Sequence, residues 1–182
     1  PDSRAYTIPT AVRLTGKLSM AGLHQSLVQV VERHDTLRTH YPTVDGDAVP
    51  VVVPATEAAA QIAIEQVDLS PLAVVDQQAE IKRLIQHQTQ QNFDLAQGPL
   101  WRAQLLRLGD QEHILLFALH HIVADGWSMG ILLKELTAFY QAFQTNEPVD
   151  LRPLSIRYGD YAAWQKSLDL SEQISYWQQQ LQ

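Results

Sequence analysis

Residues 119–128, Leu-His-His-Ile-Val-Ala-Asp-Gly-Trp-Ser, join two different hydrophobic patterns. The segment before them, 114–119, is continuously apolar and predicts a strand that is buried on both faces. From Met129 to Phe143 the apolar residues recur every three or four positions, which predicts a helix with one buried side. The sequence therefore places two histidines and an aspartate in a strand-to-helix loop over residues 120–128, where a rigid scaffold commonly presents functional side chains.

The rest of the chain alternates between strand and helix patterns. Strands are expected near residues 6–14, 62–67 and 101–106, and helices near residues 20–33 and 74–92. Pro9 favours an edge position for the first strand, and Asp45-Gly46 is typical of a hairpin turn. With 182 residues, 46% of them hydrophobic, the chain can form one domain or one lobe of a larger unit. The expected fold class is α+β, a mixed-sheet α/β sandwich.

Composition excludes several kinds of partner. The net charge of -7 argues against binding to nucleic acid or to an anionic membrane surface, both of which require a basic stripe. No apolar run reaches the length of a membrane helix, and the first residues do not resemble a signal peptide. The chain has no cysteine, which excludes a disulfide framework and a thiol nucleophile and is typical of a cytoplasmic protein.

The two histidines are the first candidates for chemistry. A neutral imidazole at His120 or His121 could accept a proton from an attacking amine or hydroxyl. Adjacent side chains at a strand end point to opposite faces, so one histidine should face solvent and the other should be held inside. Asp125 is expected to lock the loop by pairing with an arginine.

Other interpretations of these residues stay open at this stage. The loop could be purely structural, or its His and Asp side chains could bind a metal, although they lack the spacing of H-E-x-x-H. A serine hydrolase is less favoured because Ser128 lacks the G-x-S-x-G turn, and no phosphate or dinucleotide glycine motif is present. Arg33 and Arg38 could hold a carboxylate, or they could be solvated residues at a helix end.

Three stretches together resemble the condensation domain family of nonribosomal peptide synthetases. Residues 120–126, His-His-Ile-Val-Ala-Asp-Gly, match the family's HHxxxDG signature and continue into Trp-Ser as in the peptide-forming members. Residues 33–41, Arg-His-Asp-Thr-Leu-Arg-Thr-His-Tyr, resemble its RHExLRTxF motif, with Asp35 and Tyr41 as departures. Residues 158–164, Tyr-Gly-Asp-Tyr-Ala-Ala-Trp, are similar to its YxDYAxW motif.

The resemblance implies a chloramphenicol-acetyltransferase-like fold, in which two lobes enclose an active-site tunnel. The chain, 1–182, would be most of the amino-terminal lobe, truncated at both ends, with the carboxy-terminal lobe absent. His121 would face the tunnel as general base or positioning residue, and His120 would be structural. Asp125 would hold the loop through Arg38, or alternatively Arg33. Gly126 would let the backbone turn close to the substrate.

The activity implied by the resemblance is formation of an amide bond between a donor acyl thioester and an acceptor aminoacyl thioester. The partners would be donor and acceptor peptidyl carrier proteins, which carry the substrates on phosphopantetheine, and the missing lobe. The lobe itself would bind no cofactor or metal, and the isolated lobe would be inactive and prone to self-association. The alternatives are a non-catalytic carrier-docking lobe and an epimerisation domain or other HHxxxDG acyltransferase, although Trp127-Ser128 disfavours the epimerase.

Overall fold

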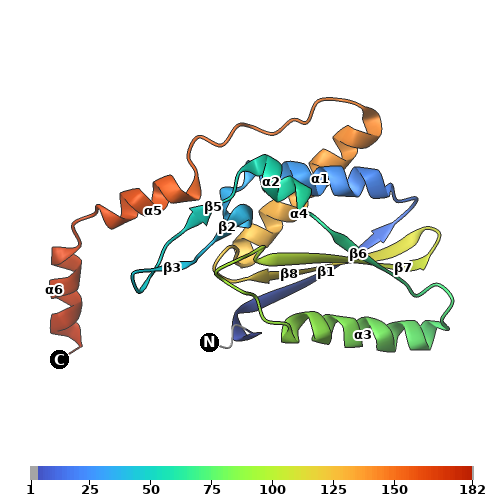
Figure 1. Cartoon of the computed structure of the whole chain (residues 1–182), viewed down its shortest axis with the longest axis horizontal. Coiled ribbons are helices and arrows are strands. Elements are labelled where there is room, and N and C mark those ends of the chain that lie inside the picture. The colour runs from blue at the N-terminus through green and yellow to red at the C-terminus, as the bar shows by residue number, and fades with distance from the viewer. Residues whose placement is uncertain (1–3, 182) are drawn as a thin grey trace. The chain divides into compact units, whose positions relative to one another are not determined.

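The computed structural model describes residues 4–181, and the chain divides into two compact units between Arg152 and Pro153. The second unit consists of α5 (Tyr158–Lys166) and α6 (Ser171–Gln180). The first unit contains a short 3-10 helix, η2 (Asp35–Arg38), and the following elements in chain order: β1 (Thr7–Thr15), α1 (Met20–Arg33), β2 (Thr39–His40), β3 (Thr43–Val44), β4 (Asp47–Ala48), β5 (Val51–Val52), α2 (Ala55–Ala60), β6 (Ile64–Asp68), α3 (Val74–Gln90), β7 (Trp101–Gly109), β8 (Glu112–His120) and α4 (Gly126–Thr145) (Figure 1).

The first unit is built on a four-stranded sheet in the order β1-β8-β7-β6. β8 is antiparallel to both of its neighbours, while β6 runs parallel to β7. Leu119, near the end of β8, lies opposite Ile8 on β1 and Trp101 on β7. The mixed sheet agrees with the expected fold class, and the edge position of β1 explains how the strand accommodates Pro9.

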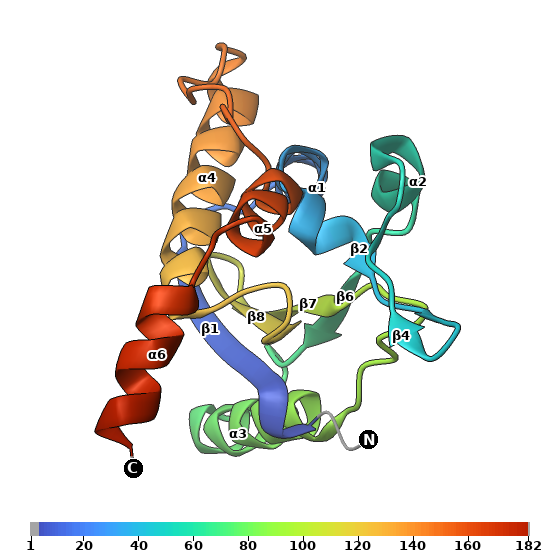
Figure 2. The same cartoon turned by 90° about the vertical axis from the view of Figure 1, so that its left-hand side faces the viewer.

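Helices cover both faces of this sheet. α1 and α4 lie on one face, and α3 lies on the other (Figures 1 and 2). Alternate residues of β8 supply the two cores, because strand side chains point to opposite faces. Phe117 packs with Leu27 and Val30 of α1, whereas Leu116 packs with Leu84 of α3. The continuous apolar pattern of this strand therefore reflects burial on both faces, as predicted.

Local signals set the helix boundaries. The Ser19 hydroxyl accepts a hydrogen bond from Gly22 N at 3.1 Å, so α1 begins at Met20 as expected. Asp45 and Gly46 both have positive φ and turn β3 into β4. α4 begins at Gly126, three residues earlier than the sequence pattern predicted, because Asp125 caps it. The loop that follows β8 is consequently shorter than expected and spans residues 121–125.

Between residues 4 and 181, no helix combines the length and the apolar character that crossing a membrane requires.

Two glycines make a matched pair for testing the packing of α1 on α4. A Cβ at Gly22 would come within 2.8 Å of Phe143 and 3.1 Å of Tyr140, whereas a Cβ at Gly130 of α4 would meet nothing within 4 Å. We expect Gly130→Ala to raise the free energy of unfolding by up to about 1 kcal/mol through helix propensity alone. Gly22→Ala should lower it, because the two rings must move. Urea denaturation of both variants measures the difference, and an equal gain at both sites would contradict close helix packing.

Candidate active site

His120 is the last residue of β8, and its imidazole is buried, with 6% of the residue exposed. The ring lies between the aromatic rings of Tyr6 and Phe93, with centroids 6.0 and 6.1 Å away. Its Nδ1 accepts a hydrogen bond from Ile122 N at 3.1 Å, which requires an unprotonated Nδ1. Burial, with a smaller contribution from His121, lowers the pKa of His120. A neutral ring that holds the loop backbone fits the structural role predicted for this residue.

His121 comes directly after β8 and has the opposite environment. Its backbone N–H donates to Tyr6 O at 2.7 Å, which fixes the main chain at the end of the sheet. Its side chain is exposed, as is Asp125 farther along the loop. The structure therefore confirms that the two imidazoles face different environments and that His121 is the accessible one. An exposed imidazole is available to exchange a proton with a substrate.

Asp125 is the N-cap of α4. Its Oδ1 accepts hydrogen bonds from Ser128 N at 2.7 Å and Ser128 Oγ at 2.6 Å. These bonds lower the pKa of the Asp125 carboxyl group, which keeps it charged at the positive end of the helix dipole. Gly126 is the first residue of α4, and a Cβ there would meet nothing within 4 Å. No protein atom in the described part of the chain therefore requires a glycine here, and a close approach of substrate to Gly126 stays a prediction.

The expected ion pair between Asp125 and an arginine of the earlier motif is wrong for both candidates. Arg38 pairs instead with Asp35, three residues before it in η2, and also donates to Val53 O. Arg33 pairs with Glu135 of α4. Each charge finds a partner other than Asp125, so the loop is held by Ser128 and by the sheet end. Arg33 and Arg38 support the fold around the site without contacting Asp125.

Glu135 is a buried carboxylate that our sequence interpretation missed. Only 6% of the residue is exposed. Its Oε1 accepts a hydrogen bond from Arg33 Nε at 3.1 Å, and its Oε2 is hydrogen-bonded to His34 Nε2 at 2.6 Å. The contact joins the end of α1 to the middle of α4, the helix that begins at the histidine loop. The available signal was its position, because Glu135 interrupts the buried stripe formed by Leu132 and Leu136.

Across the described part of the chain, no three His, Cys, Asp or Glu side chains are arranged so that they could hold a metal ion.

The sequence model of the condensation domain family matches residues 1–182. The chain belongs to the condensation domain family. It is 43% identical over 185 residues to one of the linear gramicidin synthase proteins of Brevibacillus parabrevis, and the alignment covers 100% of the chain but 4% of that synthase. It is also 41% identical over 179 residues to malpinin synthetase of Mortierella alpina, with 96% of the chain and 2% of the synthetase covered. The family assignment confirms the resemblance drawn from the three motifs, and the chain spans only a small part of the relatives that it matches.

Solved structures confirm the fold of this condensation-domain chain. The SgcC5 protein of Streptomyces globisporus matches with a TM-score of 0.80 and 27% identity, over 97% of this chain and 40% of that protein. The complex of the X-domain and OxyB from teicoplanin biosynthesis contains a chain that matches with a TM-score of 0.80 and 29% identity, over 96% of this chain and 38% of that one. The chain therefore has the fold of one lobe of a condensation domain.

The Glu135 contact predicts a large difference between two glutamate variants. Glu135→Ala leaves Arg33, which is also mostly buried, without its carboxylate, so the free energy of unfolding should fall by about 3 kcal/mol. Glu112→Ala removes an exposed pair with Arg13 and should cost less than about 1 kcal/mol. Chemical denaturation of the two variants provides the measurement, and similar losses would show that Glu135 is not a tie between α1 and α4.

The lowered pKa of His120 predicts a specific loss of stability in mild acid. The unfolded chain takes up the proton at its ordinary pKa, near 6.5, while the buried ring resists it, so stability should fall as the pH drops below about 6.5. His120→Asn keeps an acceptor near Nδ1 but does not titrate, so it should lose less stability than the wild type between pH 7.5 and 5.5. His87→Asn, at an exposed position of α3, serves as the control and should lose as much stability as the wild type in the same urea titrations.

Proposed function

We propose that this chain supplies the histidine loop of a domain that forms amide bonds between substrates bound to carrier proteins. Condensation domains of nonribosomal peptide synthetases are acyltransferases, and this chain belongs to their family. The observation that supports the proposal is the different exposure of the two adjacent histidines in the loop. His120 is buried and bonded to Ile122 N, while His121 is exposed beside it. One side chain is thus free for substrate at the point where its neighbour fixes the backbone.

The proposed reaction joins a donor acyl thioester to the amine of an acceptor aminoacyl thioester. The amine nitrogen attacks the donor carbonyl carbon, and His121 accepts the proton that the nitrogen loses or positions the amine through a hydrogen bond. The tetrahedral intermediate then collapses, the C–S bond breaks, and the donor thiolate leaves and takes up a proton. The products are an amide on the acceptor carrier and a free phosphopantetheine thiol on the donor carrier. No cofactor or metal is needed on this lobe.

We propose that a second lobe covers the loop in the active protein and that the isolated chain is inactive. Trp127, the second residue of α4, has 83% of its surface exposed. Ile122 in the loop and Tyr6, which directly precedes β1, are also exposed. Apolar surface of this kind next to a functional loop is typical of an interface. In the isolated chain the same surface could bring two copies together, which sedimentation would detect. A cytoplasmic location stays a prediction from composition.

A second candidate function is docking without chemistry. The structural relative from teicoplanin biosynthesis is a complex of an X-domain and OxyB, so this fold also occurs in a protein–protein complex. In that case the chain would bind a carrier or a tailoring protein, and the loop would serve only the fold. The accessible His121 favours the catalytic proposal, because a loop with a purely structural task has no need of an exposed imidazole.

Replacement of His121 in the full-length synthetase distinguishes the two functions. General base catalysis contributes about 100-fold to 10,000-fold, whereas holding the two tethered reactants together contributes independently of the side chain. His121→Ala should therefore lower the rate of peptide formation by about 100-fold or more without abolishing it. The matched control is His87→Ala, which removes an exposed histidine on α3. Single-turnover assays with both carriers loaded give the rates.

An unchanged rate for His121→Ala would exclude the general-base role. Carrier binding without any peptide product from the unmodified protein would support docking, and an inverted donor centre without coupling would support an epimerase.

A further inference from the structure

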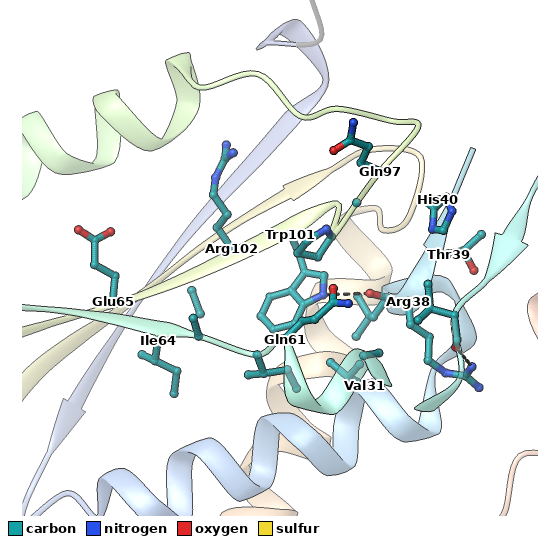
Figure 3. A pocket seen from close by; sticks show the side chains of 18 of the residues that line it. Val31, Arg38, Thr39, His40, Gln61, Ile64, Glu65, Gln97, Trp101 and Arg102 are labelled. Atoms are coloured by element: carbon teal, nitrogen blue, oxygen red, sulfur yellow. Dashed lines mark hydrogen bonds between the residues drawn. The ribbon is translucent and has the colours of Figure 1, made fainter. Parts of the chain in front are cut away.

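A cavity of about 320 Å³ lies between the end of α1, α2 and the start of β7 (Figure 3). Its apolar wall is formed by five buried residues, Val31, Leu37, Ile62, Trp101 and Ala103. None of its lining residues belongs to the histidine loop, residues 121–125. The volume falls at the lower end of the range of about 300 to 1,000 Å³ that is typical of ligand sites. The cavity is therefore large enough for a small ligand and is not explained by the proposed reaction.

Trp101 makes the centre of the cavity wall apolar. Its indole N–H donates to Leu37 O at 2.9 Å, so the polar edge of the ring is already satisfied (Figure 3). The ring therefore offers the cavity only carbon surface, next to Val31 and Ile64. Such a surface accepts an aliphatic or aromatic group and gives no hydrogen bond to a polar one.

Glutamine amides surround this apolar wall. Gln61, Gln88, Gln91 and Gln97 all line the cavity, and Gln61 and Gln97 are exposed at its mouth (Figure 3). Gln88 is 6% exposed, and within residues 4–181 its Oε1 has no hydrogen-bond partner. A buried acceptor without a donor is costly unless a ligand or water supplies one. Side-chain amides both donate and accept, which is the pattern that a peptide group requires.

The charges at the cavity argue for a neutral ligand. Arg38 is paired with Asp35, so the two together carry no net charge. Arg102 donates to the carbonyl oxygens of Asn92 and Gln91 at 3.3 and 3.0 Å, and its guanidinium lies 3.9 Å from the Phe93 ring centroid. The Nε of each guanidinium group has no hydrogen-bond partner within residues 4–181, but Glu65 also lines the cavity and balances the charge of Arg102. The lining therefore carries no net charge that would select a carboxylate or a phosphate.

We infer that this cavity binds a short neutral peptide or aminoacyl amide, with an apolar side chain against Trp101 and the peptide group on the glutamine rim. The inference goes beyond the proposed amide synthesis, because binding here requires neither His121 nor a carrier protein. The site lies close to the loop in the sheet, since Trp101 is the cross-strand partner of Leu119, the residue before the two histidines.

Titration of the nitrogen-15-labelled chain with N-acetyl-leucine amide, followed by NMR, tests the ligand class. The indole N–H signal of Trp101 should shift and saturate, while that of Trp127, which does not line the cavity, should not move. N-acetyl-alanine amide should bind at least about ten-fold more weakly, because the smaller side chain leaves the apolar wall uncovered. N-acetyl-leucine as its free carboxylate should bind no more tightly than the amide. The absence of a saturable Trp101 shift would overturn the site, and tighter binding of the carboxylate would overturn the neutral ligand class.

Two variants at the cavity rim and one control variant outside it test where the ligand binds. Gln61→Leu removes a rim amide and Ala63→Phe narrows the mouth, and both positions are exposed, so the fold does not depend on them. Each should weaken binding of N-acetyl-leucine amide by about ten-fold or more. Gln66→Leu, at an exposed glutamine of β6 outside the cavity, is the matched control and should bind normally. Wild-type affinity in both rim variants, with an unchanged circular dichroism spectrum, would contradict the inference. Because the readout is binding without carrier proteins, it is independent of the His121 activity test.

Discussion

The pairing of β8 with strands on both of its sides is the constraint on which the rest of the structure depends. β1 and β7 pair with the backbone of β8 along its two edges, and helices bury both of its faces. A strand held in this way has a fixed register, so the direction of each side chain at its end is also fixed. The burial of His120 and the exposure of His121 follow from this register, and their different chemistry follows from the burial.

The charged residues around the loop are satisfied without a link between the two motifs. Asp125 bonds to Ser128 in the first turn of its own helix, and Arg38 bonds to Asp35 within η2. A long-range polar contact forms at Glu135, which connects α1 to α4. The positioning of the loop thus comes from two separate sources, namely the end of the sheet on one side and the attachment of α4 to α1 on the other.

The fold was largely predictable from the sequence because its signals are local. The apolar run of β8, the Ser19 cap and the Asp45-Gly46 turn each act within a few residues, and the structure shows them as predicted.

The partner of Asp125 was not predictable in the same way. The sequence contains several arginines and several carboxylates, and it does not determine which of them form ion pairs. That choice depends on distances that only the folded chain defines. The early start of α4 has the same origin, because the sequence favours an ion pair for Asp125 where the structure has a helix cap. The cavity next to Trp101 shows a further limit, because its lining comes from segments that are distant along the chain and share no recognisable motif.

The position of β1 in the sheet has a consequence for the order of assembly on the ribosome. Thr7 lies opposite His120, so more than a hundred further residues have to be synthesised after β1 before its partner strand exists. At typical translation rates of about 5 to 20 residues per second, β1 remains an unpaired strand for several seconds. Pro9 lacks a backbone donor, and Arg13 is exposed, so β1 is a poor template for pairing with other chains during that interval. Because His121 N donates to Tyr6 O just before β1, the start of the histidine loop gains this main-chain partner only when β1 has paired with β8.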